Sequence, residues 1–373
     1  MIYADNAATT QLDIDAFERM KQFLLNDYGN ASQPYSFSRA AKKALKEARA
    51  TIAGCICALP EEIYFTSGGT ESDNWAVKGL QSFGDDRAVV TSKIEHHAIL
   101  NACAATERMG FPVGYLPVDK HGIVLPKVLC DVITSKTKLV SIMLANNEIG
   151  TIEPVKELAQ IAHAHGALFH TDAVQAVGHI PIDVNALGVD MLSASGHKFN
   201  APKGIGFLYI KKGVNIHPYA DGGGQEFGMR AGTENVAAIV AMAAALKKNC
   251  DNMQETQRKL LRMETEFIQT LDDAGTDYIR NGSPNRIPGN INISIRGANG
   301  EMLLHRLDLK GICISTGSAC DSINTQVSHV IEAIEVPAAY AQGTIRVSFG
   351  AMNYEDDART VAKSIIDILK IKK

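Results

Sequence analysis

The chain has 373 residues, of which 46% are hydrophobic and 21% charged, and its net charge is −4. This length exceeds what one hydrophobic core usually supports, so we expect one large and one smaller domain. The mild negative charge without long runs of Lys and Arg argues against nucleic acid as a partner, and the lack of a long apolar stretch or a secretion signal predicts a cytoplasmic protein without a membrane span.

Short apolar runs alternate with helical patterns from about residue 60 to residue 210. Such runs are typical of buried strands in a mostly parallel sheet with helices on both faces, so we expect an α/β fold. The predicted strands are Ile63–Thr66, Ala88–Thr91, Leu139–Leu144, Ala167–Asp172, Met191–Ala194 and Ile205–Ile210.

The rest of the chain has a different pattern. A long helical stretch over residues 234–271 is expected to bend or break near residues 250–252. Strands at Asn290–Ile295 and Thr344–Phe349, separated by helices, favour a smaller α+β domain. The predicted large domain covers residues 10–255, and the predicted small domain covers residues 1–9 and 256–373.

Polar residues stand where two of the predicted strands end. Lys198 follows the apolar run at residues 190–194, and Asp172 closes another such run. In open α/β sheets, ligands bind beyond the carboxyl ends of the strands. A lysine that bonds a cofactor aldehyde, with a carboxylate beside the pyridine nitrogen, is the layout of a pyridoxal phosphate site.

The segment Thr66–Thr70 places two glycines between a strand and a helix. Glycines there let backbone N–H groups approach an anion, and the helix dipole favours negative charge, so Gly69 and Thr70 are candidate phosphate ligands. Ser195 and His197 are the right types to donate to the same phosphate. A tight connection without a ligand is the alternative interpretation of this segment.

Cysteine spacing argues against a disulfide framework and against a zinc site. The seven cysteines form an odd count without a C-x-x-C pair, and His163, His165 and His170 span a helix end, a turn and a strand, so we expect no metal. Cys320 differs from the others because it lies in a polar stretch of small residues, which predicts an exposed loop thiol.

Eight ordered motifs, collinear over essentially the whole chain, resemble those of the NifS-like cysteine desulfurases, which are fold-type I pyridoxal phosphate enzymes. The motifs are Asp5–Thr10, Thr66–Asn74, Glu95–His96, Asn146–Gly150, His170–Gln175, Ser195–Lys198, Gly228–Thr233 and Ser315–Cys320.

The resemblance implies a role for each residue at the cofactor ring. Lys198 is expected to bond the cofactor and then to act as the base that moves the Cα proton. Asp172 would pair with the pyridinium nitrogen. His96 would stack on the ring and serve in proton transfer, although two histidines opening a helix can also simply cap it. Asn147 and Gln175 would hold the ring face and its phenolic oxygen.

The resemblance also implies how phosphate and substrate are bound. Gly69, Thr70, Ser195 and His197 would bind the phosphate, joined by Thr233 from a second subunit, which predicts a homodimer. The glycine-rich composition of residues 221–233 agrees with an inter-subunit role. Arg346, a charged residue in an apolar strand, would take the substrate carboxylate through two parallel hydrogen bonds, and Asn147 would assist it.

The activity implied is conversion of L-cysteine to L-alanine, with the sulfur held as a persulfide on Cys320. A protein acceptor would take it, either an iron–sulfur scaffold or a tRNA-thiolation enzyme. Asp321 stands where the family more often has a small hydroxyl residue, and the chain ends at Lys373 without the longer tail of some relatives, so the sequence leaves the acceptor open. Alternatives are another fold-type I enzyme, such as an aminotransferase or a selenocysteine lyase, and a catalytically idle sulfur-transfer scaffold.

Overall fold

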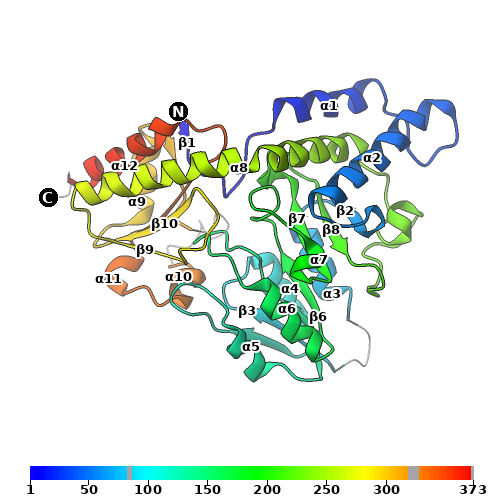
Figure 1. Ribbon diagram of the computed structural model, residues 1–373, viewed down its shortest axis with the longest axis horizontal. Helices are drawn as coiled ribbons and strands as arrows, with labels where there is room; N and C mark the ends of the chain where they lie inside the picture. The colour runs from blue at the N-terminus through cyan, green and yellow to red at the C-terminus, as the bar shows by residue number, and fades with distance from the viewer. Residues whose placement is uncertain (82–85, 318–326, 371–373) are drawn as a thin grey trace.

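The computed structural model describes residues 1–81, 86–317 and 327–370. A large sheet and a small sheet, each packed against helices, are joined by one long helix, α8 (Val236–Asp273), which crosses the molecule in Figure 1. The large sheet has the strand order β2-β8-β7-β6-β5-β3-β4. Its strands are β2 (Ile63–Thr66), β3 (Ala88–Ser92), β4 (Val113–Leu116), β5 (Thr137–Ser141), β6 (Leu168–Asp172), β7 (Met191–Ser195) and β8 (Gly206–Ile210).

Five strands of the large sheet, β4, β3, β5, β6 and β7, run parallel, and β8 runs antiparallel to both of its neighbours. The expected mostly parallel sheet is therefore confirmed. The register sets Asp172 of β6 opposite Ser193 of β7, and His170 opposite Ser141 of β5. Strand β5 ends at Ser141 rather than at the expected Leu144, so Met143 belongs to the loop beyond the strand.

Successive residues of these strands pack into two different apolar clusters. Val140 and Phe207 belong to the larger cluster, whereas their neighbours Leu139 and Leu208 belong to a second one. Because side chains alternate across a strand, the two clusters are the two faces of the sheet. The helices that accompany the large sheet are α1 (Ile14–Leu25), α2 (Arg39–Cys55), α3 (Gly69–Lys78), α4 (His97–Arg108), α5 (Pro126–Val132), α6 (Val155–Ala164) and α7 (Val184–Leu187).

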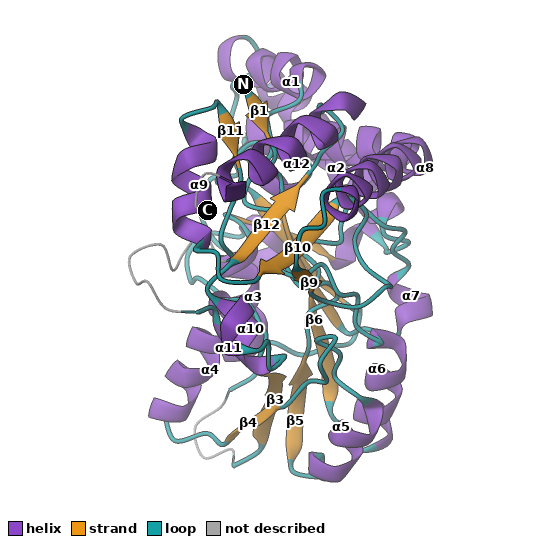
Figure 2. Ribbon diagram, turned by 90° about the vertical axis from the view of Figure 1, so that its left-hand side faces the viewer, coloured by secondary structure: helices purple, strands orange, loops and turns teal. Residues whose placement is uncertain are grey.

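The second half of the chain forms an antiparallel sheet of three strands in the order β12-β10-β9, visible beside α12 in Figure 2. A short parallel pair joins the N-terminus to this half. The strands are β1 (Ile2–Tyr3), β9 (Tyr278–Arg280), β10 (Asn290–Ile295), β11 (Ile312–Cys313) and β12 (Thr344–Ser348). The helices are α9 (Gly300–Asp308), α10 (His329–Ala333), α11 (Ala338–Ala341) and α12 (Glu355–Lys370).

Helix α8 is continuous over 38 residues, so the expected break near residues 250–252 was wrong. Cys, Asp and Asn cost a helix only a few tenths of a kcal/mol each, on the order of 0.7 at most, and tertiary packing overrides such costs. Residues 238–246 of α8 pack in the large-sheet cluster and residues 260–271 pack against the small sheet. The predicted domain boundary at residue 255 falls inside this helix, and the division stays a prediction.

The N-terminal segment Asp5–Thr10 runs between the two halves and contacts both. Asp5 forms an isolated bridge with Ser348 of β12, and Thr10 N donates to His197 O at 2.9 Å beyond β7. This segment therefore closes one side of the space above the carboxyl ends of the central strands. Within the part of the chain that the structure describes, no helix combines the length and the apolarity that a membrane crossing requires.

Candidate active site

A cavity of about 250 Å³ lies where β6 and β7 end. Most of the residues predicted from the sequence line it: Gly69, Thr70, His96, Asn147, Asp172, Gln175, Ser195, His197, Lys198 and Arg346. The wall also contains residues to which the sequence analysis gave no role: Ala7, Ala8, Asp73, Met143 and Val174. Residues from seven separate sequence regions thus meet in one space.

Lys198 ends a short turn that follows β7. Its Nζ donates to two backbone carbonyls of the N-terminal segment, Ala7 O at 2.6 Å and Ala8 O at 2.9 Å. The Lys198 carbonyl lies 2.9 Å from Nε2 of the half-buried His179. The backbone and the amine of Lys198 are therefore both held, and the amine lies at the wall between the two halves of the molecule.

Asp172, the last residue of β6, is 4% exposed. Burial raises the pKa of Asp172 to about 6, although the Val174 N–H bond and the charge of Lys198 lower it. Val174 N donates to Asp172 Oδ1 at 2.9 Å, which fixes the carboxyl orientation. Gln175 lies one turn further on and donates from Nε2 to Ala7 O at 2.9 Å.

One end of the cavity is suited to an anion. Helix α3 begins at Gly69, and the preceding Gly68 has φ +149°, a conformation that other residues rarely adopt. Because glycine has no side chain, the first N–H groups of α3 receive no side-chain cap from this position. Thr70, Ser195 and His197 add polar groups to the same wall. Burial, and then the charge of Lys198, lowers the pKa of His197 to about 4, so the ring is neutral near pH 7.

His96 serves two purposes. Its Nδ1 accepts a hydrogen bond from Ala98 N at 3.1 Å and thereby caps helix α4, while its ring lines the cavity. His96 therefore caps α4, as one interpretation of the sequence held, and it also lines the cavity. Because Nδ1 accepts, the proton of the neutral ring lies on Nε2.

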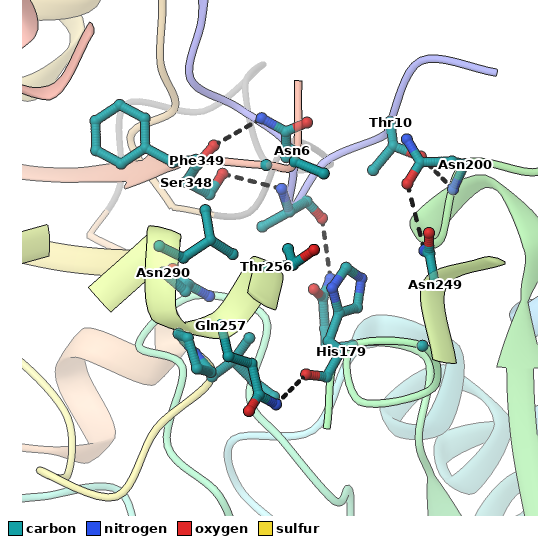
Figure 3. Close-up of a pocket in the computed structure, with 18 of the residues that line it drawn as sticks. Asn6, Thr10, His179, Asn200, Asn249, Thr256, Gln257, Asn290, Ser348 and Phe349 are labelled. Carbon is teal, nitrogen blue, oxygen red and sulfur yellow. Dashed lines mark hydrogen bonds between the residues drawn. The ribbon is translucent and has the colours of Figure 1, made fainter. Parts of the chain in front are cut away.

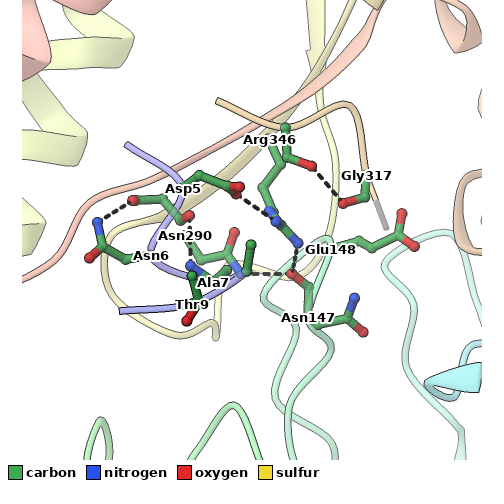
Figure 4. Close-up of polar contacts among 12 residues, drawn as sticks. Asp5, Asn6, Ala7, Thr9, Asn147, Glu148, Asn290, Gly317 and Arg346 are labelled. Carbon is green, nitrogen blue, oxygen red and sulfur yellow. Dashed lines mark hydrogen bonds and ion pairs between the residues drawn. The ribbon is translucent and has the colours of Figure 1, made fainter. Parts of the chain in front are cut away.

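Arg346 lies in the middle of β12 and is 1% exposed. Figure 4 shows its guanidinium directed toward the N-terminal segment and toward Asn147. Nη2 lies 2.7 Å from Asp5 Oδ1, and Nη1 donates to Asn147 O at 2.9 Å. A buried guanidinium needs a counter-charge, and no residue next to Arg346 in the sequence supplies one. Asp5, near the N-terminus, provides it.

Two predicted residues are not among those that line the cavity. Thr233 is exposed, and Cys320 lies outside the described residues. The segment that leads to Cys320 starts beside Arg346, since Ser315 and Arg346 exchange backbone hydrogen bonds of 3.0 and 2.7 Å. The described part of this segment therefore begins at the cavity wall.

A smaller cavity of about 60 Å³ adjoins the first and shares Ala7 and Gln175 with it. Figure 3 shows amide side chains from α8, the N-terminal segment and β10 around it. Among its contacts, Gln257 Nε2 donates to His179 O at 2.7 Å and Asn6 Nδ2 donates to Ser348 O at 3.0 Å. The Asn6 contact ties the N-terminal segment to β12, next to the carbonyls of Ala7 and Ala8 that hold Lys198.

Residues 2–361 match the family described as Aminotransferase class-V. The cysteine desulfurase IscS of Dictyoglomus turgidum is 47% identical over 359 residues, which cover 95% of this chain and 91% of that protein. A solved NifS-like protein superimposes with a TM-score of 0.93 at 36% identity and covers 99% of both chains. The structure described as SspA in complex with cysteine has a TM-score of 0.83 at 33% identity, covering 95% of this chain and all of that one.

Proposed function

Because the chain belongs to the class-V aminotransferase family and is a cysteine desulfurase, we propose that its cavity holds pyridoxal phosphate and that Cys320 receives the sulfur of L-cysteine. The observation that carries this proposal is the meeting of Lys198, Asp172 and Arg346 in one cavity. An amine, a carboxylate and a guanidinium are the three groups that such a reaction needs from the protein.

The residues present fit the cofactor. The uncapped N-terminus of α3, together with Thr70 and Ser195, offers neutral donors suited to a phosphate. A Cβ on Gly69 would lie 2.6 Å from Val174 Cγ2, so the cradle requires glycine. Asp172 would hold the ring nitrogen, Lys198 the aldehyde carbon, and His96, Asn147 and Gln175 would hold the ring. Bound pyridoxal phosphate would supply an electron-accepting ring that makes the substrate's Cα proton acidic.

The chain's own groups would do the remaining work. The Arg346 guanidinium would bind the substrate carboxylate, with Asn147 beside it. Lys198 Nζ would remove the proton from Cα and later return one, and its contacts with Ala7 O and Ala8 O would hold it ready within the site. His96 Nε2 would carry a second movable proton.

The Cys320 thiolate would attack the substrate sulfur, take it as a persulfide and leave L-alanine as the other product. The test is the Cys320→Ser variant, with Cys57→Ser as the matched control because Cys57 is exposed and lies outside the cavity lining. Cys320→Ser should keep its visible absorbance and its spectral response to cysteine but form no alanine. Cys57→Ser should form alanine normally.

Near-normal alanine and sulfide formation by Cys320→Ser would instead favour another fold-type I enzyme, and absence of activity in the unaltered protein would favour the idle scaffold. Selenocysteine lyase activity is tested by comparing kcat/KM for L-selenocysteine and L-cysteine. Borohydride reduction and peptide mapping should place the cofactor on Lys198; another lysine, or none, would overturn its assignment.

We also propose a homodimer in which Thr233 completes the partner's phosphate site. Thr233 is exposed, which leaves it available to a second subunit. The residues before it are anchored, since Arg230 Nε donates to Glu71 Oε1 at 2.9 Å and Glu226 pairs with the buried Arg49. Sedimentation should give a dimer. Thr233→Ala should weaken cofactor retention without dissociating the dimer. A fully loaded, active monomer would contradict the proposal.

For the sulfur acceptor we propose a protein partner, either an iron–sulfur scaffold or a tRNA-thiolation enzyme. Loading the enzyme with ³⁵S-labelled cysteine and offering each class of acceptor separately distinguishes them. Label that moves to one class and not to the other identifies the acceptor, and label that leaves only as free sulfide contradicts a dedicated partner.

A further inference from the structure

Two buried carboxyl groups face the same cavity. Asp172 ends β6, and Asp73 lies in α3 four residues after Gly69, so Asp73 and Gly69 share a helix face. Asp172 is 4% exposed and Asp73 is 1% exposed, yet both line the cavity. Among the described residues, Asp73 Oδ1 has no hydrogen-bond partner. A buried polar atom without a partner at a cavity wall requires an explanation.

His170, on β6, does not neutralise Asp73. Its Nε2 lies 3.8 Å from Asp73 Oδ1, which is beyond hydrogen-bond distance. Both ring nitrogens are instead 2.9 Å from hydroxyls, Nδ1 from Ser141 Oγ and Nε2 from Ser193 Oγ. Complete burial lowers the pKa of His170 to about 3, so the ring is neutral at physiological pH. A neutral ring provides no counter-charge.

Lys198 and Arg346 line the same cavity, but the charges that shift the pKa of Asp73 are of its own sign. Burial, and then the negative charges of Asp172 and Glu95, raise the pKa of Asp73 well above its ordinary value, while Ser193 opposes this. Glu95 is itself buried, and burial raises its pKa as well. Two buried carboxylates whose charges interact cannot both ionise without a cost, so we expect Asp73 and Asp172 to carry one proton between them.

The contacts decide which of the two holds it. Asp172 accepts the Val174 N–H bond at Oδ1 and feels the positive charge of Lys198, and both stabilise its ionised form. For Asp73, only the hydrogen bond of the Ser193 side chain favours the ionised form, and Asp73 Oδ1 has no hydrogen-bond partner among the described residues. We propose that Asp73 is a positioning residue that holds the shared proton, so that the negative charge of the pair stays on Asp172. The charge then lies where the cofactor's ring nitrogen would be, and only this last step rests on the proposed function.

Infrared difference spectroscopy of the cofactor-free protein tests the location of the proton directly. At about pH 8, where exposed carboxyls are ionised, the wild-type spectrum minus that of Asp73→Asn should contain the carbonyl band of a protonated carboxylic acid. A carboxylate band in its place would mean that Asp73 is ionised, and the proposal would be wrong.

The coupling to Asp172 is tested with Asp172→Asn, which removes the neighbouring charge. The Asp73 acid band should then disappear at a lower pH than in the wild type. The buried Glu153, whose pKa is raised to about 8 by burial, is the control: its band, assigned with Glu153→Gln, should titrate at the same pH in both proteins. An unchanged Asp73 titration would refute the coupling.

Thermal unfolding of the cofactor-free protein gives a readout that a merely structural role would not move. An acid whose folded pKa is raised contributes stability that is lost as pH rises through that pKa, and Asn at position 73 cannot ionise. The Tm of Asp73→Asn minus that of the wild type should therefore grow by about 2 °C or more between about pH 4 and pH 8.

A constant difference across pH would indicate packing alone and overturn the proposal. If Asp73→Asn does not fold, the acid band of the wild type and its shift in Asp172→Asn still decide the question. None of these measurements requires cofactor or turnover, so failure of the desulfurase proposal and failure of this one are distinguishable.

Discussion

Arg346 Nη2 lies 2.7 Å from Asp5 Oδ1, although the two residues are 341 positions apart in the sequence. Asp5 and the Asn147 carbonyl occupy parts of the guanidinium, while Arg346 Nε has no hydrogen-bond partner among the described residues. The guanidinium of Arg346 is thus fixed in orientation by these two contacts.

We expect Arg346→Lys to raise KM for L-cysteine by about 10- to 100-fold, with a smaller change in kcat. Lysine keeps the charge but loses the paired donors, and one hydrogen bond to a charged group is worth about 1.5–3 kcal/mol. Steady-state alanine formation measures this. Arg262→Lys, in a surface ion pair with Glu355, is the control and should leave KM unchanged; an unchanged KM in Arg346→Lys would remove Arg346 from carboxylate binding.

Arg49→Met should lower the free energy of unfolding by about 3–5 kcal/mol, because it leaves the carboxylate of Glu226 buried without its partner. The Arg49 Nη2 and Glu226 Oε1 atoms are 2.6 Å apart, and both side chains are nearly buried. Adding Glu226→Gln to Arg49→Met should recover part of the loss. Urea denaturation midpoints decide this, and equal midpoints for the single and double variants would mean that the charge is not the cause.

Gly206→Ala should destabilise the protein by about 1–3 kcal/mol and weaken cofactor binding. An added Cβ would collide with Ala194 O and would come within 2.7 Å of Gly68 Cα, at the turn that opens α3. Gly54→Ala, in α2, is the matched control because an added Cβ there meets nothing within 4 Å. Thermal unfolding and cofactor titration test both variants; equal behaviour would show that the turn can shift freely.

Acid should destabilise the cofactor-free protein partly through His197. The folded pKa is about 4 against 6.5 for an ordinary histidine, so between these values the unfolded chain binds more protons and stability falls as pH falls. His197→Gln should reduce this loss, whereas His165→Gln, at an exposed position, should not. Tm measured across this pH range tests the prediction, and an identical slope in all three proteins would contradict it.

Sequence patterns predicted the central strands well because each is a short apolar run, and β2 (Ile63–Thr66) has the expected bounds. Strand β4 was missed because Val113–Leu116 contains Gly114 and is mostly half-buried at the sheet edge, so its apolar signal is weak. The strand ends that carry Asp172 and Lys198 were recognised because the change from apolar to polar is abrupt there.

Sequence reasoning missed Ala7, Ala8 and Asp73, because their places at the site depend on backbone groups and on burial, which residue type does not reveal. Ala7 and Ala8 hold Lys198 with backbone carbonyls, and an alanine's side chain gives no sign of that role. Asp73 looks the same in sequence whether its helix face meets water or a cavity. Both lay inside matched motifs, Asp5–Thr10 and Thr66–Asn74, and this was the only available signal.

The uninterrupted helix α8 acts as a rigid strut, connecting the two halves of the protein. Its 38 residues span about 57 Å at 1.5 Å per residue, and its two ends are embedded in different apolar clusters. A hinge between the two halves would have to bend this strut and break its internal hydrogen bonds. We therefore expect access to the cavity to be controlled by segments that α8 does not stiffen. Lys198 follows β7 of the large sheet and Arg346 lies in β12 of the small sheet, so the distance between them is expected to stay fixed during turnover.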